Sequence, residues 1–133
     1  MVDGSFDPLH DGHIEYFKAA AEFGLPVLCN IASDRWTRHK HPVLLEQSRR
    51  AIVLDSIRYL SFVLVGCSST LIALETVKPK ILAKGRDWLD SGGLPSDELL
   101  LCSRLQIDVK YLDSVRNSSS AMLAQFNSQQ HRQ

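Results

Sequence analysis

The sequence predicts an α/β protein of Rossmann-like form, a three-layer α/β/α domain built around a parallel five-stranded sheet. Three observations support this prediction. Short apolar segments alternate with helical patterns, one of these segments is apolar enough to be covered on both faces, and polar motifs directly follow several of them. The 133 residues, with 44% hydrophobic content, suit one domain. We expect it to span residues 1–126, followed by a disordered tail over residues 127–133 that lacks an apolar face.

The chain starts with the shortest of the expected elements. A strand must lead into Gly4, and residues 1–3 leave less than the usual length of about five or six residues. A trimmed chain, a piece of a larger protein and a naturally short strand all stay open. Apolar and small side chains at helical spacing then predict a helix over residues 14–21, which Gly24 ends.

The next strand is predicted over residues 26–32, an apolar run that only Asn30 interrupts. Residues 35–42 are polar, basic and aromatic, and this composition predicts a loop. Apolar residues on a helical period follow the loop. They predict a second helix over residues 45–60.

The second half of the chain continues the alternation of strands and helices. Apolar runs predict strands over residues 62–65, 81–83 and 107–112. Helical patterns, several of which begin with serines that can cap a helix, predict helices over residues 68–77, 96–105 and 118–126. Parallel strands in such a fold end at one edge of the sheet, where ligands bind. We therefore expect the polar residues that follow the strands to meet there.

The junction of the first strand and the first helix has the sequence GSFDPLHDGH, residues 4–13. Imidazoles can donate hydrogen bonds to phosphate oxygens, and a helix N-terminus adds unpaired backbone N–H groups and a partial positive charge. The junction therefore predicts a polyphosphate site. In an alternative interpretation His10 caps a turn and His13 is a polar residue of the first helical turn, which leaves their spacing around Gly12 unexplained.

This segment resembles the G-x-F-D-x-x-H-x-G-H signature of the cytidylyltransferase-like nucleotidyltransferases. The resemblance implies an enzyme that transfers CMP or AMP from CTP or ATP to the phosphate of a small sugar or polyol and releases pyrophosphate. It implies catalytic roles for His10 and His13. Nucleotide contacts are implied for Gly4, Ser5, Phe6, Asp7 and Gly12.

Magnesium (Mg2+) is the expected cofactor, because it accompanies triphosphates and keeps water and phosphate oxygens as ligands. Asp7 is the nearest candidate carboxylate, as a ligand directly or through water. An Asp7 that only braces the turn is an equal alternative.

The basic loop lies where members of this family carry a mobile segment that closes over the triphosphate. Lys40 is the expected third catalytic residue, stabilising charge on the leaving pyrophosphate, with an ordinary exposed loop as the alternative. Asp34 follows a strand end and Arg50 matches a family arginine, so both are expected to bind substrate. A solvated helix residue is the alternative for Arg50.

Two later segments also resemble family motifs. Lys84, Gly85 and Asp87 match the K-G-x-D-[WY] segment of the sugar-phosphate and polyol-phosphate members, which implies nucleotide contacts, with a solvated turn as the alternative. The segment before the last helix is similar to I-S-[ST]-[ST], although Asn117 replaces the usual apolar residue. It implies phosphate contacts from Arg116, Ser118, Ser119 and Ser120.

The nucleotide and the class of function stay open between alternatives. The spacing of the loop and helix after Asp87 resembles that of the ADP-heptose synthase branch of the family. Trp88 instead resembles the residue typical of the glycerol-3-phosphate cytidylyltransferase branch. The sequence therefore does not choose between ATP and CTP. The short first strand and Asn117 also allow a nucleotide-binding regulatory or remnant domain without turnover.

Composition disfavours other classes of partner. The 15 basic and 15 acidic side chains cancel, which disfavours a dedicated nucleic-acid or membrane-surface protein. No segment reaches the roughly 18 apolar residues of a membrane span, so we expect a cytoplasmic protein, and a homodimer is the commonest assembly. The three cysteines lack C-x-x-C spacing, and His39 and His41 lack further ligands nearby, so structural zinc is not expected.

Overall fold

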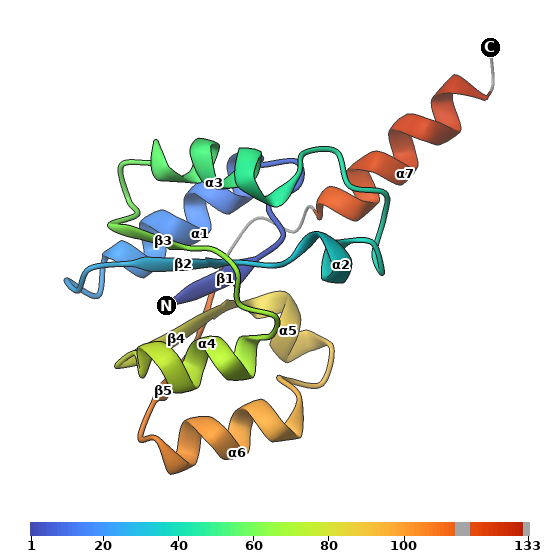
Figure 1. Ribbon diagram of the computed structural model, residues 1–133. Coiled ribbons are helices and arrows are strands. Elements are labelled where there is room, and N and C mark those ends of the chain that lie inside the picture. The colour runs from blue at the N-terminus through green and yellow to red at the C-terminus, as the bar shows by residue number, and fades with distance from the viewer. Residues whose placement is uncertain (114–117, 132–133) are drawn as a thin grey trace.

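Strands and helices alternate along the chain in the computed structural model, which describes residues 1–113 and 118–131 (Figure 1). The elements are β1 (Val2–Gly4), α1 (Asp11–Ala21), β2 (Leu28–Ile31), α2 (Asp34–Thr37), α3 (Gln47–Asp55), β3 (Phe62–Leu64), α4 (Thr70–Val77), β4 (Ile81–Gly85), α5 (Arg86–Asp90), α6 (Ser96–Arg104), β5 (Asp108–Leu112) and α7 (Ser119–Gln130). Every strand pair that the structure describes is parallel. The predicted α/β class is therefore confirmed.

The strands form two sheets that adjoin at β1. One sheet has the order β1-β2-β3, and the other pairs β4 with β5. The amino group of Met1 donates to the carbonyl of Ile81 at 2.7 Å, and the N–H of Ala83 donates to the carbonyl of Met1 at 2.9 Å, so β1 lies beside β4. A single five-stranded sheet overstates this arrangement, because β1 has only 3 residues and cannot carry a full ladder to β4.

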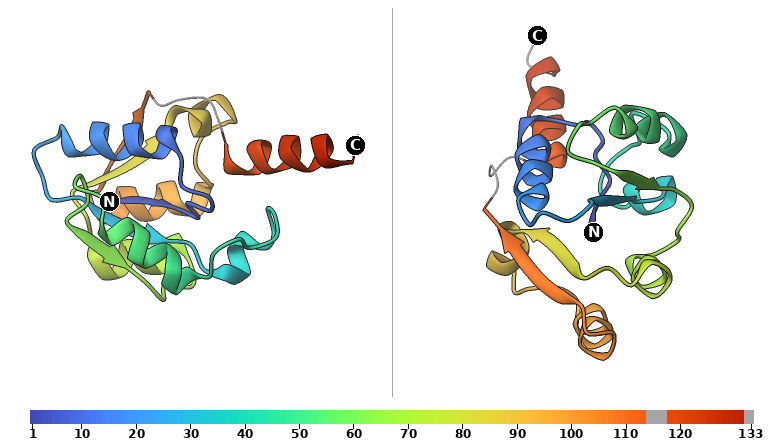
Figure 2. Two further views of the ribbon diagram at one scale, coloured as in Figure 1. Left: turned by 90° about the horizontal axis from the view of Figure 1, so that it is seen from above. Right: turned by 90° about the vertical axis from the view of Figure 1, so that its left-hand side faces the viewer.

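Helices cover both faces of the strands, as Figures 1 and 2 show. On one side, α1 and α3 bury Phe17 and Leu54 against Val2 of the central strand. On the other side, α4 and α6 bury Leu74 and Leu101. Each fully buried side chain of this kind contributes about 1.5–3 kcal/mol of transfer free energy. The three-layer arrangement predicted from the sequence is therefore present, with one apolar core in each outer interface.

Three helices differ from the expectation. The helix predicted over residues 45–60 is α3, which runs only from Gln47 to Asp55, because the backbone of Glu46 is not helical (φ −57°, ψ 153°) and the chain leaves the helical conformation after Ser56. The predicted loop contains the short helix α2, whose first turn is capped by the Ser33 hydroxyl. The helix α5 follows β4 directly, where a turn was the alternative expectation.

The last helix, α7, projects away from the rest of the molecule (Figures 1 and 2). It continues to Gln130, so residues 127–130, which were expected in a disordered tail, extend the helix. None of the helices in the described part of the chain has both the length and the apolar character needed to cross a lipid bilayer.

Candidate active site

A cleft of about 960 Å³ opens at the carboxyl ends of β1 and β4. It is lined by residues from the start of α1, the segment that follows α2, α5 and the start of α7. The residues expected at the site that line it are Gly4, Ser5, Phe6, Asp7, His10, Gly12, His13, Lys40, Lys84, Gly85, Asp87, Ser118, Ser119 and Ser120. Asp34 and Arg50 do not line it. Arg116 and Asn117 lie outside the described residues.

His10 and His13 form the N-terminal cap of α1. The Nδ1 atom of His10 accepts from the backbone N–H of Gly12 at 3.1 Å, and the Nδ1 atom of His13 accepts from the backbone N–H of His10 at 3.3 Å. The two side chains thereby satisfy backbone donors that a helix start leaves unpaired. An imidazole nitrogen that accepts carries no proton, so each neutral ring holds its proton on Nε2.

The two rings stack against each other in the wall of the cleft. The rings stack at a centroid separation of 3.8 Å with planes 20° apart, and both line the cleft. The Nε2 atom of His10 is buried and has no hydrogen-bond partner among residues 1–113 and 118–131. A buried donor without a partner is rare and costly in a folded protein. This donor therefore indicates a ligand with an acceptor atom.

The environment of the two histidines keeps them neutral. Burial lowers the pKa of His10, although the nearby charge of Asp11 opposes the shift. Burial also lowers the pKa of His13 to about 3, and proximity to His10 adds to this effect. Both rings are therefore neutral near pH 7, and each offers one N–H donor rather than a full positive charge.

Phe6 positions His13. Its ring meets the His13 ring edge-on, with centroids 5.0 Å apart and planes 87° apart, and it packs against Phe17 on its other side. The Phe6 ring also lies over Gly4, where an added Cβ atom would come within 3.0 Å of it. A glycine at position 4 thus leaves room for the aromatic ring that supports the histidine.

Lys84 is held in place at the floor of the cleft. Its ammonium group bonds to Asp3, and the side chains of both residues are only 5% exposed. The Nζ atom also lies 4.9 Å from the centroid of the Trp88 ring, and Thr70 donates to the second oxygen of Asp3 at 2.9 Å. The carboxylate neutralises much of the lysine charge, so Lys84 shapes the cleft as one half of an ion pair.

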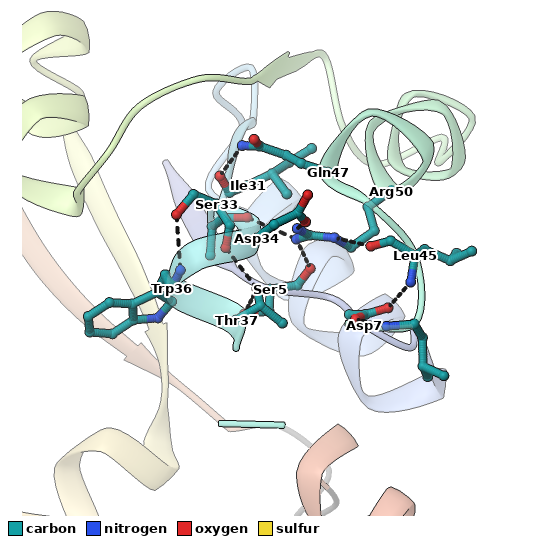
Figure 3. A network of polar contacts seen from close by, with 12 residues as sticks. Ser5, Asp7, Ile31, Ser33, Asp34, Trp36, Thr37, Leu45, Gln47 and Arg50 are labelled. Atoms are coloured by element: carbon teal, nitrogen blue, oxygen red, sulfur yellow. Dashed lines mark hydrogen bonds and ion pairs between the residues drawn. The ribbon is translucent and has the colours of Figure 1, made fainter. Parts of the chain in front are cut away.

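Arg50 lies in a buried polar network beneath the cleft (Figure 3). Its guanidinium donates to the carbonyls of Leu45, Ser5 and Ala32 and to the carboxylate of Asp34. Hydrogen bonds occupy four of its donors, and the side chain is 0% exposed. Neither the substrate contact nor the solvated helix position expected from the sequence describes this arginine, because its bonds join α3 to α2 and to the segments that follow β1 and β2 inside the protein.

Asp34 belongs to the same network and not to the cleft. Burial raises the pKa of its carboxyl group, but the hydrogen bond and charge of Arg50, with a further contribution from Arg38, outweigh that effect and leave the pKa below its usual value. The carboxylate stays ionised at neutral pH and serves as the counterion of Arg50.

Asp7 braces the chain instead of presenting a free carboxylate. It is 0% exposed, and its two oxygens accept from the backbone N–H groups of Leu44 and Leu45 at 2.8 and 3.0 Å. A magnesium ion needs accessible oxygen ligands in octahedral geometry. Asp7 does not fit a direct magnesium ligand, and the described residues contain no group of three or more His, Cys, Asp or Glu side chains arranged to hold a metal ion.

The basic segment is tied to the first motif. The Thr37 and Ser5 hydroxyls are hydrogen-bonded to each other at 3.0 Å, and the backbone N–H groups of Lys40 and His41 donate to the Thr37 carbonyl in the turn after α2. Lys40 and His41 both line the cleft. Lys40 is exposed and has no ion-pair partner in the part of the chain that the structure describes.

The start of α7 closes the far side of the cleft. The Ser118 hydroxyl accepts from the N–H of Ala121 at 3.1 Å and caps the helix. The Ser119 hydroxyl donates to the carbonyl of Pro8 at 2.7 Å, which ties this helix start to the loop that carries the two histidines. The serine motif before the last helix, residues 118–120, thus contacts the first motif, although the two lie near opposite ends of the sequence.

Three residues of the site region escaped the sequence analysis. Asp3 is the partner of Lys84, the Tyr16 hydroxyl donates to the Ala83 carbonyl within the cleft wall, and Thr37 carries the basic segment. A charged residue inside the otherwise buried first strand was the one available signal, and it pointed to Asp3. Tyr16 and Thr37 look like ordinary helix and loop residues until the distant segments meet.

The fold is Rossmann-like, and the cleft lies at the carboxyl ends of its strands, where helix N-termini and two neutral histidines meet. The chain belongs to the cytidylyltransferase-like family, which matches residues 1–126.

Its relatives include the bifunctional protein HldE of Campylobacter fetus, 32% identical over 90% of this chain and 26% of that protein. HldE of Geobacter metallireducens is 32% identical over 73% of this chain and 21% of that protein. The chain therefore spans about a quarter of these bifunctional relatives. FAD synthase of Archaeoglobus fulgidus is 30% identical over 83% of this chain and 84% of that protein.

A solved structure shares the fold. It is the lipopolysaccharide core biosynthesis protein of Thermoplasma volcanium, which superposes with a TM-score of 0.68 and covers 89% of this chain and 96% of that one. At 24% sequence identity, this likeness shows the fold alone.

Proposed function

We propose that this chain is a nucleotidyltransferase that moves CMP or AMP from CTP or ATP to the phosphate of a small sugar or polyol. The observation that carries the proposal is the buried Nε2 donor of His10, which has no partner among the described residues and lies beside His13 in the cleft. A phosphate oxygen is an acceptor that suits both donors. Membership of the cytidylyltransferase-like family supports the same activity.

The reaction needs alignment and charge stabilisation more than activation. An oxygen of the acceptor phosphate, already anionic at neutral pH, forms a bond to the α-phosphorus of the nucleotide. The bond from that phosphorus to the bridging oxygen breaks, and pyrophosphate leaves with the electron pair. In-line positioning and fixed donors for the extra charge can supply most of the rate enhancement for such a transfer.

Two sets of side chains would stabilise the charge at different parts of the reacting nucleotide. The Nε2–H donors of His10 and His13 would bind oxygens of the α-phosphate, where charge grows as the new bond forms. Lys40, an exposed cation that lines the cleft, would stabilise the leaving pyrophosphate. Neutral histidines suit this role because they donate throughout the reaction without giving up a proton.

Magnesium is proposed as a companion of the triphosphate. Bound to phosphate oxygens and water, it would neutralise part of the triphosphate charge. Because Asp7 is buried and occupied by two backbone donors, we assign no step of the reaction to a metal ligand of this chain.

The test is pyrophosphate release with ATP or CTP against a panel of sugar phosphates and polyol phosphates. A flavin phosphate is included because one relative is named FAD synthase. The His13→Ala variant, purified in the same way, controls for contaminating enzymes. Release by the parent chain alone supports the proposal. Nucleotide binding without pyrophosphate release for any pair of nucleotide and acceptor would instead favour the nucleotide-binding regulatory domain. If neither nucleotide binding nor pyrophosphate release is detected, both alternatives are contradicted.

A further inference from the structure

A second cavity, of about 310 Å³, adjoins the cleft. The two cavities share the lining residues Asp3, Gly4, Lys40, Lys84 and Trp88. They therefore meet at two lysines. The second cavity extends along β2 and the start of α4, away from the histidines. Its volume lies at the lower end of small-molecule sites, which suits a ligand much smaller than a nucleoside triphosphate.

Asn30 places an unpaired acceptor in the wall of this cavity. It lies in β2 opposite Asp3 of β1 and is only 4% exposed. Its Oδ1 atom is buried and has no hydrogen-bond partner among the described residues. An amide inside an otherwise apolar strand lowers stability unless something pairs with it. Apolar packing therefore gives no reason for an asparagine here.

Glu98 adds a second unpaired acceptor from a different element. It lies in the first turn of α6 and lines the same cavity. Its Oε2 atom is also buried without a partner in the described part of the chain. Burial raises the pKa of this carboxyl group, while the charge of Lys84 opposes the shift. The cavity is thus lined by oxygen acceptors from two elements, β2 and α6, and by the apolar side chains of Trp36 and Leu71.

We propose that the second cavity binds the hydroxylated part of the phosphate acceptor, whose hydroxyl groups donate to Asn30 Oδ1 and Glu98 Oε2. Unpaired oxygens need a donor, and a carboxylate repels a phosphate, so hydroxyl groups fit the cavity better than a second phosphate does. The inference rests on the proposed function. It places the acceptor phosphate at the junction of the cavities, from where it can face the nucleotide on the side opposite the leaving pyrophosphate.

Two variants test this assignment. Asn30→Val removes the amide and supplies a side chain that suits a buried strand. Glu98→Leu removes the carboxylate. Because neither removed oxygen has a partner in the described protein, the variants should unfold at the same temperature as the parent or higher. Glu75→Gln is the matched control, because Glu75 is exposed on α4 and pairs with Arg104 outside both cavities.

The readout is the KM of each substrate in pyrophosphate release, using glycerol 3-phosphate and a panel of hexose and heptose 1-phosphates with ATP or CTP. We expect each variant to raise the acceptor KM about tenfold, the usual effect of one lost hydrogen bond, with the nucleotide KM within about twofold of the parent value. A deoxy acceptor that lacks the paired hydroxyl should react more slowly than the complete acceptor with the parent protein. With the variant, the two acceptors should react at nearly the same rate.

The outcomes separate this inference from the proposed function. Pyrophosphate release with an unchanged acceptor KM in both variants would overturn the inference and leave the proposed function standing. If no pair releases pyrophosphate, calorimetric binding of the same phosphates decides. Binding that both variants weaken supports a hydroxylated ligand in the second cavity although the proposed function has failed. No binding, or binding that the variants leave unchanged, overturns the inference.

Discussion

The imidazole rings of His10 and His13 stack 3.8 Å apart, and each accepts a backbone N–H of the turn that starts α1. The Nδ1 atom of each ring therefore stabilises the helix, and both rings line the cleft. This arrangement explains the spacing of the pair around Gly12, because only the cap position and the third helical residue can exchange such bonds. The capping alternative therefore describes the Nδ1 atoms of the two rings, and the proposed donor role concerns their Nε2 atoms.

Substitution of His10 separates these two roles. Asparagine caps helices well, so His10→Asn should unfold close to the parent temperature. It lacks the ring donor, and we expect turnover to fall by about two to three powers of ten. His10→Ala should lose turnover to the same extent and also about 1 kcal/mol of stability. Thermal unfolding and steady-state kinetics check both, and full activity in His10→Asn would contradict the donor role.

The buried histidines predict how stability depends on pH. In the unfolded chain His13 takes up a proton near pH 6.5, whereas burial and the neighbouring His10 lower its pKa in the folded chain to about 3. Between these values the unfolded chain binds more protons, so the free energy of unfolding falls as the pH drops from about 6.5 towards about 3. Above this window the effect is absent.

Urea unfolding between about pH 7.5 and about pH 5 measures this dependence. A single histidine of this kind contributes a slope of up to about 1.4 kcal/mol per pH unit. His13→Gln does not titrate there and should show the shallower slope. Equal slopes in both proteins would show that His13 is not held neutral by the fold.

Arg50 should prove to be a structural residue. Arg50→Lys retains the charge but cannot reproduce the bonds to Ser5, Ala32, Leu45 and Asp34, so we expect a loss on the order of 3 kcal/mol in unfolding free energy. Arg49→Lys, at the exposed neighbouring position, should change it by less than about 0.5 kcal/mol. An Arg50→Lys variant with parental stability and a raised substrate KM would restore the substrate contact expected from the sequence.

Asp7 should affect stability without affecting the use of magnesium. Asp7→Asn turns one acceptor into a donor and leaves a backbone N–H of Leu44 or Leu45 unpaired, which should cost about 1–3 kcal/mol. The magnesium concentration that gives half-maximal pyrophosphate release should stay at the parent value. A large rise in that concentration with unchanged stability would identify Asp7 as a metal ligand after all.

Local patterns predicted the fold and the first motif well. The alternation of strands and helices depends on the spacing of neighbouring residues, and the cap that joins His10 and His13 spans only the turn that starts α1. Asn30 was visible as an interruption in an apolar strand, although its surroundings were not.

The buried network could not be predicted in the same way. Arg50 pairs with Asp34 and with the carbonyl of Ser5, which lie in separate elements of the chain. In the sequence both charged residues look like surface groups near a substrate. Only the folded arrangement shows that the guanidinium satisfies carbonyls of the strand ends and lies beneath the site.

The most direct test of the account is a crystal structure of this protein bound to a non-hydrolysable analogue of ATP or CTP. We expect Nε2 of His10 and Nε2 of His13 both to lie about 2.7–3.2 Å from phosphate oxygens. A nucleotide bound at full occupancy whose phosphates contact neither Nε2 atom would contradict it.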